Sequence, residues 1–306
     1  MSPDSHPKQD GATRDFVVTQ HTPHDDRALV RNAMSVDIED YFQVQAFAST
    51  IDRTSWDSWP SRVEANTDRV LGIFSDHGVK ATFFTLGWVA QRHRSLIRRI
   101  VDEGHELASH GMAHFPVFDQ TPEQFRADVR QTKTLLEDIG GVSVKGYRAA
   151  SFSITKATLW ALPILAEEGY AYSSSIYPVL HDFYGIPDAP RFAFKPQSQG
   201  ITEIPLTTVL LFGRNFPCSG GGYFRLLPYG VSHWAFRRVN AHDQKPCIFY
   251  FHPWEVDPDQ PRPAGLPLKS RLRHYVNLKR MEPRLRRLLG DFAWTRMDQL
   301  FLAGNA

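Results

Sequence analysis

Residues 33–40 read Ala-Met-Ser-Val-Asp-Ile-Glu-Asp, a short apolar run that ends in three carboxylates. A run of this length predicts a buried strand over residues 33–38. In an extended strand, Asp37 and Glu39 point to the same face. Like charges at such close range repel each other, so a cation between them would be favourable. The alternative is a strand end followed by the acidic cap of a helix.

Strands and helices alternate along the chain after this segment. Apolar runs predict further strands over residues 79–86, 106–109, 142–147 and 247–251. Helical spacing of apolar residues predicts helices over residues 61–75, 96–101, 121–139 and 155–168, the last with a kink at Pro163. The third begins with Thr-Pro-Glu-Gln at 121–124, which predicts a capping box. This alternation from residue 33 to about residue 175 indicates βα units around a parallel sheet or barrel, which is an α/β fold.

Two later segments differ from this pattern. Residues 178–245 are rich in Gly, Pro and aromatic residues, with few helical patterns. At their centre, residues 219–225 read Ser-Gly-Gly-Gly-Tyr-Phe-Arg, which predicts either a glycine turn between strands or a loop that faces a substrate. Residues 269–287 are basic, with interleaved leucines. They predict the solvated face of a terminal helix, or a peripheral contact with an anionic polymer or membrane surface.

The composition limits the class of protein. A chain of 306 residues forms one large α/β domain or two small ones. Its 42% hydrophobic and 22% charged residues exclude a collagen-like or wholly disordered chain, and its net charge of +2 gives no reason to expect a nucleic-acid partner. The two cysteines, Cys218 and Cys247, form no CxxC motif, so neither a thiolate zinc site nor a disulfide framework is expected.

The ends of the chain and its hydropathy suggest a location. Residues 1–30 are polar, and we expect a flexible tail there. No stretch reaches the roughly 18 apolar residues of a transmembrane helix. Residues 1–20 contain no apolar run of the secretory type, so we expect a cytoplasmic protein, with a periplasmic one as the alternative.

A pair of histidines follows the predicted strand at 106–109. His110 and His114 are four residues apart, so on one face of a helical turn they would grip one metal ion. Among thirteen histidines this spacing alone is a weak signal, but the pair follows a strand as Asp37 does. Gly111 excludes the H-E-x-x-H motif of a metalloprotease.

Two further polar residues also follow predicted strands. Arg148 is expensive to bury without a carboxylate, so it either orients Asp37 or lies at the surface. His252 is either a neutral core residue or a general acid, because histidine titrates near neutral pH. The sequence thus places carboxylates, a histidine pair, an arginine and a further histidine after different predicted strands. This set of groups is typical of metal-assisted hydrolysis of an amide or ester.

These motifs together resemble the NodB-type polysaccharide deacetylases of carbohydrate esterase family 4. They are Ser-Val-Asp-Ile-Glu-Asp-Tyr-Phe at 35–42, Lys-Ala-Thr-Phe-Phe at 80–84, Gly-His-Glu-Leu-Ala-Ser-His-Gly-Met-Ala-His at 104–114, Gly-Tyr-Arg-Ala at 146–149 and Tyr-Phe-His-Pro-Trp-Glu at 250–255. A closer similarity, to the subfamily found beside exopolysaccharide and exosortase (PEP-CTERM) loci, rests on Gly-Gly-Gly-Tyr-Phe-Arg-Leu at 220–226 and Arg-His-Tyr-Val-Asn-Leu at 273–278.

The resemblance spans about residues 33 to 300 and implies a fold. The family fold is a distorted (β/α)₇ barrel, here with a C-terminal extension. It implies a tail over residues 1–30, a deacetylase barrel over residues 31–260 and a subfamily-specific segment over residues 261–306 that packs on the barrel. The oligomeric state is not predicted.

The resemblance also implies an activity, the removal of N-acetyl groups from an acetylated glycan in exopolysaccharide biosynthesis. His110, His114 and Glu39 would hold a divalent metal, with Asp40 as the alternative to Glu39. Zn²⁺ is the expected metal, and Co²⁺ and Ni²⁺ are the alternatives. Asp37 would be the base that activates water, Arg148 would pair with Asp37, and His252 would protonate the leaving amine. The predicted sugar contacts are aromatic: Tyr41, Phe42, Tyr147, Tyr223 and Trp254.

Two positions depart from the family pattern. Ala150 stands where Pro is usual, and residues 173–175 read Ser-Ser-Ser where Asp-Ser-Ser is usual. Because that Asp can support the acid histidine, we expect either a weakened acid or a substitute such as Asp182 or another carboxylate. The alternatives to the deacetylase are an amidohydrolase of the allantoinase or imidase type on the same fold and a non-catalytic sugar-binding relative.

Overall fold

The computed structural model describes residues 16–17, 30–180, 184–196 and 200–303. The predicted tail therefore lies outside the described residues, apart from residues 16–17 and residue 30. The strands are β1 (Phe16–Val17), β2 (Arg31–Ile38), β3 (Thr82–Thr85), β4 (Glu106–Ser109), β5 (Gly146–Tyr147), β6 (Tyr172–Ser173), β7 (Lys195–Pro196), β8 (Thr202–Glu203), β9 (Thr208–Leu211), β10 (Arg214–Pro217), β11 (Ile248–Phe251) and β12 (Ala293–Thr295). The α-helices are α1 (Val63–Asp76), α2 (Gly87–Arg92), α3 (Arg94–Asp102), α4 (Pro122–Gly140), α5 (Ala161–Glu167), α6 (Gly221–Leu226), α7 (Tyr229–Arg238), α8 (Leu268–Tyr275), α9 (Leu278–Asp291) and α10 (Met297–Phe301).

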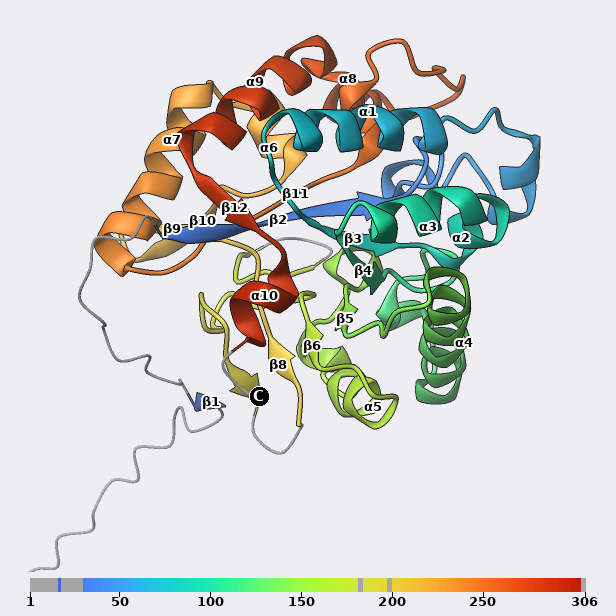
Figure 1. The fold of residues 1–306 in the computed structure, drawn as a ribbon, viewed down its shortest axis with the longest axis horizontal. Helices are drawn as coiled ribbons and strands as arrows, with labels where there is room; N and C mark the ends of the chain where they lie inside the picture. Colours follow the sequence, from blue (N-terminus) through green and yellow to red (C-terminus); the bar gives the residue numbers. More distant parts are fainter. Residues whose placement is uncertain (1–15, 18–29, 181–183, 197–199, 304–306) are drawn as a thin grey trace, which may run out of the picture.

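A curled parallel sheet with helices around it organises the fold (Figure 1). Its strands follow the order β11-β2-β3-β4-β5-β6-β8, and every pair along this path is parallel. The predicted α/β class and distorted barrel are confirmed. Within the described part of the chain β8 and β11 do not pair, so the sheet is a half-barrel that stays open between them.

The C-terminal segment adds a strand to this sheet. The first half of β2 pairs with β12, from Arg31 opposite Ala293 to Ala33 opposite Thr295. The second half of β2 pairs with β3, from Ser35 opposite Thr82 to Ile38 opposite Thr85. The predicted C-terminal segment therefore contributes β12 to the sheet itself, in addition to the helices that pack on it.

The strand register brings the strand ends together. Asp37 lies opposite Phe84 of β3, Phe84 lies opposite Ala108 of β4, and Ser109 lies opposite Tyr147 of β5. Residues that follow parallel strands meet at one edge of the sheet, which is where α/β proteins place their sites. The polar residues that follow β2, β4, β5 and β11 therefore share one edge.

The helices follow the sequence prediction best where capping residues mark them. α4 begins with the predicted capping box, in which the side chain of Thr121 accepts from the backbone N–H of Gln124 and the side chain of Gln124 accepts in return. The predicted kinked helix over residues 155–168 is wrong. A separate 3₁₀ turn (Lys156–Thr158) comes first, and Pro163 lies in the first turn of α5, where its missing N–H has no helical partner to lose.

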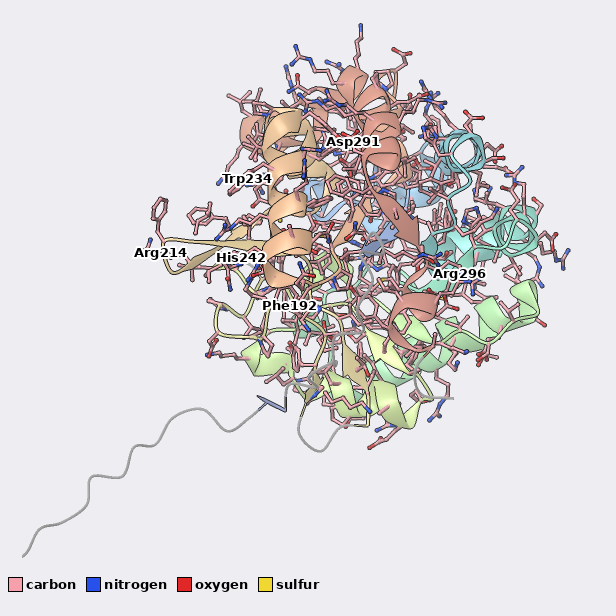
Figure 2. The ribbon with its side chains drawn as sticks, turned by 60° about the vertical axis from the view of Figure 1, so that its left-hand side comes forward. Phe192, Arg214, Trp234, His242, Asp291 and Arg296 are labelled. Carbon is pink, nitrogen blue, oxygen red and sulfur yellow. The ribbon has the colours of Figure 1, made fainter. Side chains whose placement is uncertain are left out.

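The segment over residues 178–245 is more helical than its composition predicts. It contains α6, α7 and a π-helical turn (Val239–Asp243), together with a β9–β10 hairpin that projects from the body, with Arg214 near its tip (Figure 2). Residues 219–225 do not form a turn between strands, because Gly220 is the N-cap of α6. Gly220 has a φ of +104°, a conformation that favours glycine.

The basic stretch over residues 269–287 divides into two parts. On α9, Arg284 donates to the backbone carbonyls of Phe224, Arg225 and Leu227 at the end of α6, so it has a structural role. On α8, the basic side chains are exposed. Within the residues that the structure describes, no helix combines the length and apolar character needed to span a bilayer.

Candidate active site

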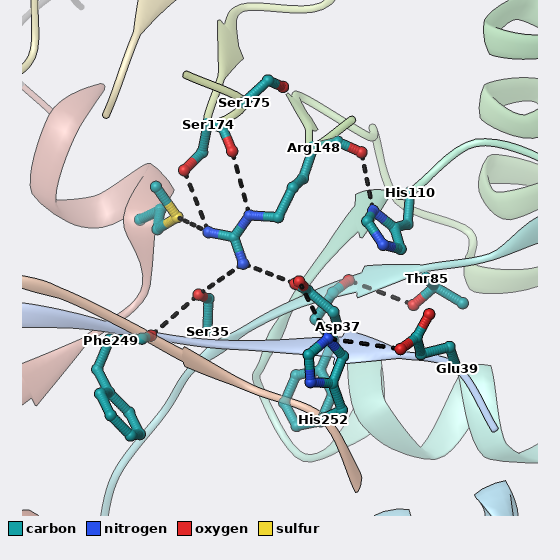
Figure 3. Close-up of polar contacts among 12 residues, drawn as sticks. Ser35, Asp37, Glu39, Thr85, His110, Arg148, Ser174, Ser175, Phe249 and His252 are labelled. Atoms are coloured by element: carbon teal, nitrogen blue, oxygen red, sulfur yellow. Dashed lines mark hydrogen bonds and ion pairs between the residues drawn. The ribbon is translucent and has the colours of Figure 1, made fainter. Parts of the chain in front are cut away.

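A cleft of about 730 Å³ opens at the edge of the sheet where β2, β4 and β11 end. Figure 3 shows the centre of the site, where polar side chains from several strands point toward one another. The five predicted catalytic or ligand residues that line this cleft are Asp37, Glu39, His110, His114 and His252.

Arg148 and Asp37 form a buried ion pair beneath the cleft. Arg148 is fully buried, and its Nη1 lies 2.6 Å from Asp37 Oδ1 and 2.9 Å from Ser35 Oγ. Its Nη2 donates to the hydroxyl of Ser174 at 3.1 Å, and its Cζ lies 4.0 Å from the centre of the Phe84 ring. The alternative that Arg148 lies at the surface is therefore wrong. One oxygen of Asp37 is held by Arg148, while the other lies 4.0 Å from His252 Nε2.

Glu39, His110 and His114 form a second group. One ligand atom from each lies within 4.8 Å of the other two. The Nδ1 atom of His110 is 2.8 Å from the carbonyl oxygen of Arg148, and because a carbonyl only accepts, Nδ1 carries the proton and Nε2 keeps its lone pair. Glu39 Oε2 lies 3.2 Å from His114 Nε2, yet this buried oxygen has no hydrogen-bond partner among the described residues.

A bent loop, not the predicted helical turn, brings the two histidines together. Gly111 and His114 both have positive φ angles, +75° and +53°, so residues 110–114 cannot continue as a helix. The carboxylate of Asp128 accepts from the N–H of Met112 at 3.1 Å. Arg53 donates to the carbonyl of His114 at 2.8 Å from the other side. The sequence analysis missed both supports, because they come from α4 and from a 3₁₀ helix (Arg53–Ser58), which are distant in sequence.

The electrostatics of this group favour a cation. Burial raises the pKa of Glu39 to about 7, and it lowers the pKa of His110 and, more strongly, that of His114. Two neutral imidazoles beside an unpaired carboxylate oxygen are donors that a divalent metal ion fits, since the ion would keep the carboxylate ionised and take up the free lone pairs. Among the described residues, these three are the group that could hold a metal ion.

Asp40, the alternative ligand, lies elsewhere. Its Oδ2 accepts from the hydroxyl of Ser61 at 2.8 Å and from the backbone N–H groups of Arg62 and Val63 at 2.7 and 3.1 Å. These contacts place Asp40 at the N-terminal end of α1, where it satisfies unpaired N–H groups. The structure therefore brings Glu39, and not Asp40, to the histidines.

A chain of buried ionic contacts supports His252. His252 Nδ1 lies 2.9 Å from Glu255 Oε1, and Glu255 Oε2 lies 2.7 Å from Arg225 Nε. Burial lowers the pKa of His252, but the carboxylates of Glu39 and Glu255 outweigh it and raise that pKa to about 9. Burial raises the pKa of Glu255, but Arg225 and His252 outweigh it and lower that pKa to about 2. The Nε2 atom of His252 thus faces Asp37 and Glu39, and the surrounding carboxylates favour the protonated form of the imidazole.

Glu255 is a carboxylate that contacts His252, the support that was expected from the Asp that residues 173–175 lack. The predicted substitute Asp182 lies outside the described residues. Sequence reasoning gave Glu255 no role, although it stands three residues after His252 in a helical turn (Pro253–Val256), a spacing at which side chains meet. The serines hold the neighbouring strand end instead, since Ser174 contacts Arg148 and the hydroxyl of Ser175 accepts from the N–H of Ala149 at 2.9 Å.

Ala150 begins a turn whose next two residues are strained. Ser151 and Phe152 have φ angles of +55° and +52°, and both line the cleft. The hydroxyl of Ser153 donates to the carbonyl of Ala150 at 2.6 Å and accepts from the N–H of Val117 at 2.8 Å. This cleft wall is thus held by side-chain hydrogen bonds without the usual proline.

Three of the five predicted sugar contacts are buried away from the cleft. Phe42 packs against Trp56, Trp59 and Trp88, and Tyr41 and Phe42 belong to the same apolar cluster. Tyr147 packs against Phe125 and Tyr170. The prediction that Tyr41, Phe42 and Tyr147 contact a sugar with their side chains is wrong, because their burial leaves no surface for one.

The other two predicted contacts line the cleft in different ways. Tyr223 is half-buried and lines it from α6. Trp254 lies stacked between His252 and His274, with ring centroids at 5.1 and 4.0 Å, so both of its faces are covered. Its Nε1 is 3.3 Å from Glu39 Oε1. Trp254 is therefore placed to orient Glu39, and it offers no free face to a sugar ring.

Comparisons with known proteins agree with this geometry. Residues 45–172 match the family model for polysaccharide deacetylases, and residues 174–302 match a domain of unknown function, DUF3473. Arg148 and the two histidines of the loop belong to the first match, whereas His252 and Glu255 belong to the second. The chain therefore contains a region similar to polysaccharide deacetylases, and residues of the second matched region complete the cleft.

Individual relatives match over shorter stretches. The chain is 30% identical over 96 residues to a peptidoglycan-N-acetylglucosamine deacetylase of Bacillus cereus, which is 31% of this chain and 35% of the relative. It is 48% identical over 48 residues to a chitooligosaccharide deacetylase of Sinorhizobium fredii, which is 16% of this chain and 22% of the relative. The chain thus spans about a third or less of the length of these two relatives.

A solved structure has the same fold. The crystal structure of a Mycobacterium smegmatis protein assigned to the polysaccharide deacetylases matches with a TM-score of 0.58 and 18% identity. The match covers 92% of this chain and 93% of that chain. At this identity the match establishes the fold alone.

The Glu255 contact predicts a strict requirement at Gly221. A Cβ atom at Gly221 would lie 2.1 Å from Glu255 Oε2, whereas a Cβ at Gly222 would meet nothing within 4 Å. We expect Gly221→Ala to lower the free energy of unfolding by about 1–3 kcal/mol through overpacking. Gly222→Ala, the matched control in the same helix, should leave it unchanged or raise it. Urea denaturation measures both, and equal stabilities of the two variants would contradict the contact.

Proposed function

We propose that this protein is a metal-dependent hydrolase that removes N-acetyl groups from a polysaccharide or oligosaccharide. The observation that carries the proposal is the arrangement in one cleft of Asp37, held by Arg148, and His252, held by Glu255, around the Glu39, His110 and His114 group. The names of the relatives, which are deacetylases of peptidoglycan and of chito-oligosaccharides, support the class of substrate.

Glu39, His110 and His114 would hold the metal. We propose Zn²⁺, because two neutral imidazoles and one carboxylate with further positions open are a donor set typical of catalytic zinc. Co²⁺ and Ni²⁺ accept the same donors. When bound, the ion supplies Lewis acidity toward a water molecule and a carbonyl oxygen.

Asp37 and His252 would move the protons. Arg148 holds one oxygen of Asp37 and keeps the carboxylate oriented, so the other oxygen can take a proton from the attacking water. The Glu255 carboxylate raises the pKa of His252 and so favours its protonated form. The Nε2 atom can then give a proton to the amide nitrogen as the carbon–nitrogen bond breaks. Acetate and a free amine are then the two products.

We further propose that the substrate belongs to exopolysaccharide biosynthesis. The subfamily-like motifs at 220–226 and 273–278 support this, and both lie in the region that matches DUF3473. Arg225 from the first motif contacts Glu255, and its Nη1 also donates to the carbonyl of His274 in the second. The two motifs on which the closer resemblance rests therefore hold Glu255, the residue that contacts His252.

Release of acetate tests the proposed function. The full chain, with added Zn²⁺, Co²⁺ or Ni²⁺, would be incubated with defined acetylated glycans, allantoin and cyclic imides, and acetate and free amine would be quantified. The proposal expects equal amounts of acetate and amine from at least one N-acetylated glycan. Turnover of allantoin or imides alone would instead assign an amidohydrolase, and bound metal without any hydrolysis would assign a binding protein.

The base assignment predicts the effect of Asp37→Asn. The variant should lose acetate release by about 10²–10⁴-fold, which is the usual contribution of a general base. It should still bind metal, because Asp37 is not part of the ligand group. The control is Asp259→Asn, an exposed carboxylate outside the cleft. Acetate release at the wild-type rate by Asp37→Asn would rule out this base.

The ligand assignment predicts that Glu39 and Asp40 differ. Glu39→Gln should weaken Zn²⁺ binding more than about tenfold, since even residues that merely support ligands contribute 10–100-fold. Asp40→Asn, the matched control, should keep the affinity and instead lower the free energy of unfolding by about 1 kcal/mol, as expected for a weakened cap. Calorimetric titration after chelator treatment measures the affinities. A loss of affinity in Asp40→Asn alone would reverse the assignment.

Glu255 is a positioning residue for His252, and its removal should change the pH profile. Because the Glu255 carboxylate raises the pKa of His252, Glu255→Gln should lower that pKa, so the protonated acid is lost at a lower pH. The alkaline limb of the profile of kcat/KM should move to lower pH, with a fall of at least about tenfold at neutral pH. Glu282→Gln, a change outside the cleft, is the control. A fall in rate with an unmoved alkaline limb would show that Glu255 acts only in folding.

A further inference from the structure

The wall of the cleft formed by α8 and the chain before it is strongly basic. Residues 260–281 contain six Lys or Arg residues and no Asp or Glu. Four of them, Arg262, Lys269, Arg271 and Arg273, line the cleft and are exposed. None of the four forms an ion pair with an acidic residue in the described part of the chain, so we define them as the basic rim. Such a concentration of positive charge on one wall of a cleft attracts an anionic ligand group.

Exposed leucines accompany the basic rim. Leu268 and Leu272 lie one turn apart on α8 and are 67% and 63% exposed, while His274 on the opposite face is buried. Leu226 of α6 is 59% exposed and lines the cleft together with Leu272. Large apolar side chains gathered at the mouth of a binding cleft mark a surface for an apolar ligand group. The rim thus joins positive charge to hydrocarbon surface.

The basic rim belongs to the concave wall of the cleft. The guanidinium of Arg262 lies 4.9 Å from the ring centre of Tyr275, which also lines the cleft. Tyr184, Tyr223 and Arg273 all line the cleft. Burial and Tyr223 raise the pKa of Tyr184, whereas the positive charge of Arg273 lowers it, so Arg273 lies near Tyr184. Arg262 and Arg273 therefore lie on the cleft wall, within reach of a substrate that occupies the cleft.

We propose that the basic rim binds the diphosphate of a lipid-linked glycan, so that the substrate is a glycosyl diphosphate with a hydrocarbon tail. Arginine and lysine recognise phosphate by charge-assisted hydrogen bonds, and Leu226, Leu268 and Leu272 provide apolar surface for the first part of the tail. This inference rests on the proposed function. The acetylated sugar would lie at the inner end of the cleft, beside Asp37 and His252, and the diphosphate would lie at the rim. A uronate-bearing glycan would use the charges but not the leucines.

Four forms of one N-acetylated trisaccharide test this proposal. The free sugar, its octyl glycoside, its uridine diphosphate ester and its farnesyl diphosphate ester would be compared by kcat/KM with the zinc-loaded full chain. We expect the farnesyl diphosphate form to exceed the free sugar at least tenfold, with the uridine diphosphate form between them and the octyl form near the free sugar. The preference should shrink as salt is added.

Charge reversal locates the effect. In Arg271→Glu/Arg273→Glu, the preference for the farnesyl diphosphate form should fall at least tenfold. Arg237→Glu is the matched control, because Arg237 is an exposed residue that does not line the cleft and lies on α7, the helix that carries Trp234 in Figure 2. Direct binding of farnesyl diphosphate, with and without added zinc, gives a second readout that needs no catalysis, and it should weaken in the double variant alone.

The outcomes separate the two proposals. Equal kcat/KM for the free and diphosphate forms, or a preference that survives charge reversal, overturns the diphosphate site. Binding of phosphatidylglycerol vesicles that depends on Arg271 and Arg273, without any substrate preference, also overturns it and assigns a bilayer contact. If no form releases acetate, the proposed function fails, and the binding of farnesyl diphosphate still decides the role of the rim.

Discussion

The ion pair between Arg148 and Asp37 is the interaction on which the site depends. A fully buried guanidinium without a partner would cost several kcal/mol, so the fold must supply a carboxylate and further acceptors. It does so from β2, through Ser35 and Asp37, and from the segment after β6, through Ser174. The backbone of Arg148 extends the connection, since its N–H donates to Ser109 of β4 and its carbonyl accepts from His110. One residue thus fixes Asp37, which is the proposed base, and His110 of the proposed metal site, and it links several strands.

A second buried ion pair repeats this arrangement on the other side of the cleft. Arg225 and Glu255 are both buried, and Arg225 also donates to the carbonyls of His274 and Val276. This pair orients His252 as Arg148 orients Asp37. It comes from the region that matches the domain of unknown function, so that region supports His252 and forms the outer wall of the cleft. The missing aspartate at Ser173 is then no reason to expect an inactive relative.

The sequence predicts well what depends on local pattern. The apolar run before Asp37, the strand at 106–109 and the capping box at Thr121 led to elements that the structure contains, and the strand ends led to the edge where the site lies. The prediction failed where contacts with residues distant in sequence determine the conformation of a segment or the burial of a side chain. The bend at His110–His114 depends on Asp128 and Arg53. The burial of Tyr41, Phe42 and Tyr147 depends on which helices cover them. The role of Glu255 could have been predicted from the sequence, because a residue three positions after His252 in a helical turn contacts its side chain.

Anomalous diffraction from crystals grown with Zn²⁺ tests the central claim most directly, because it locates the ion without assuming any reaction. The account predicts one strong peak within bonding distance of Glu39 and of the imidazoles of His110 and His114, with Asp37 still paired to Arg148. A peak at Asp40, or no peak at this edge of the sheet while the protein retains its fold, would contradict the account.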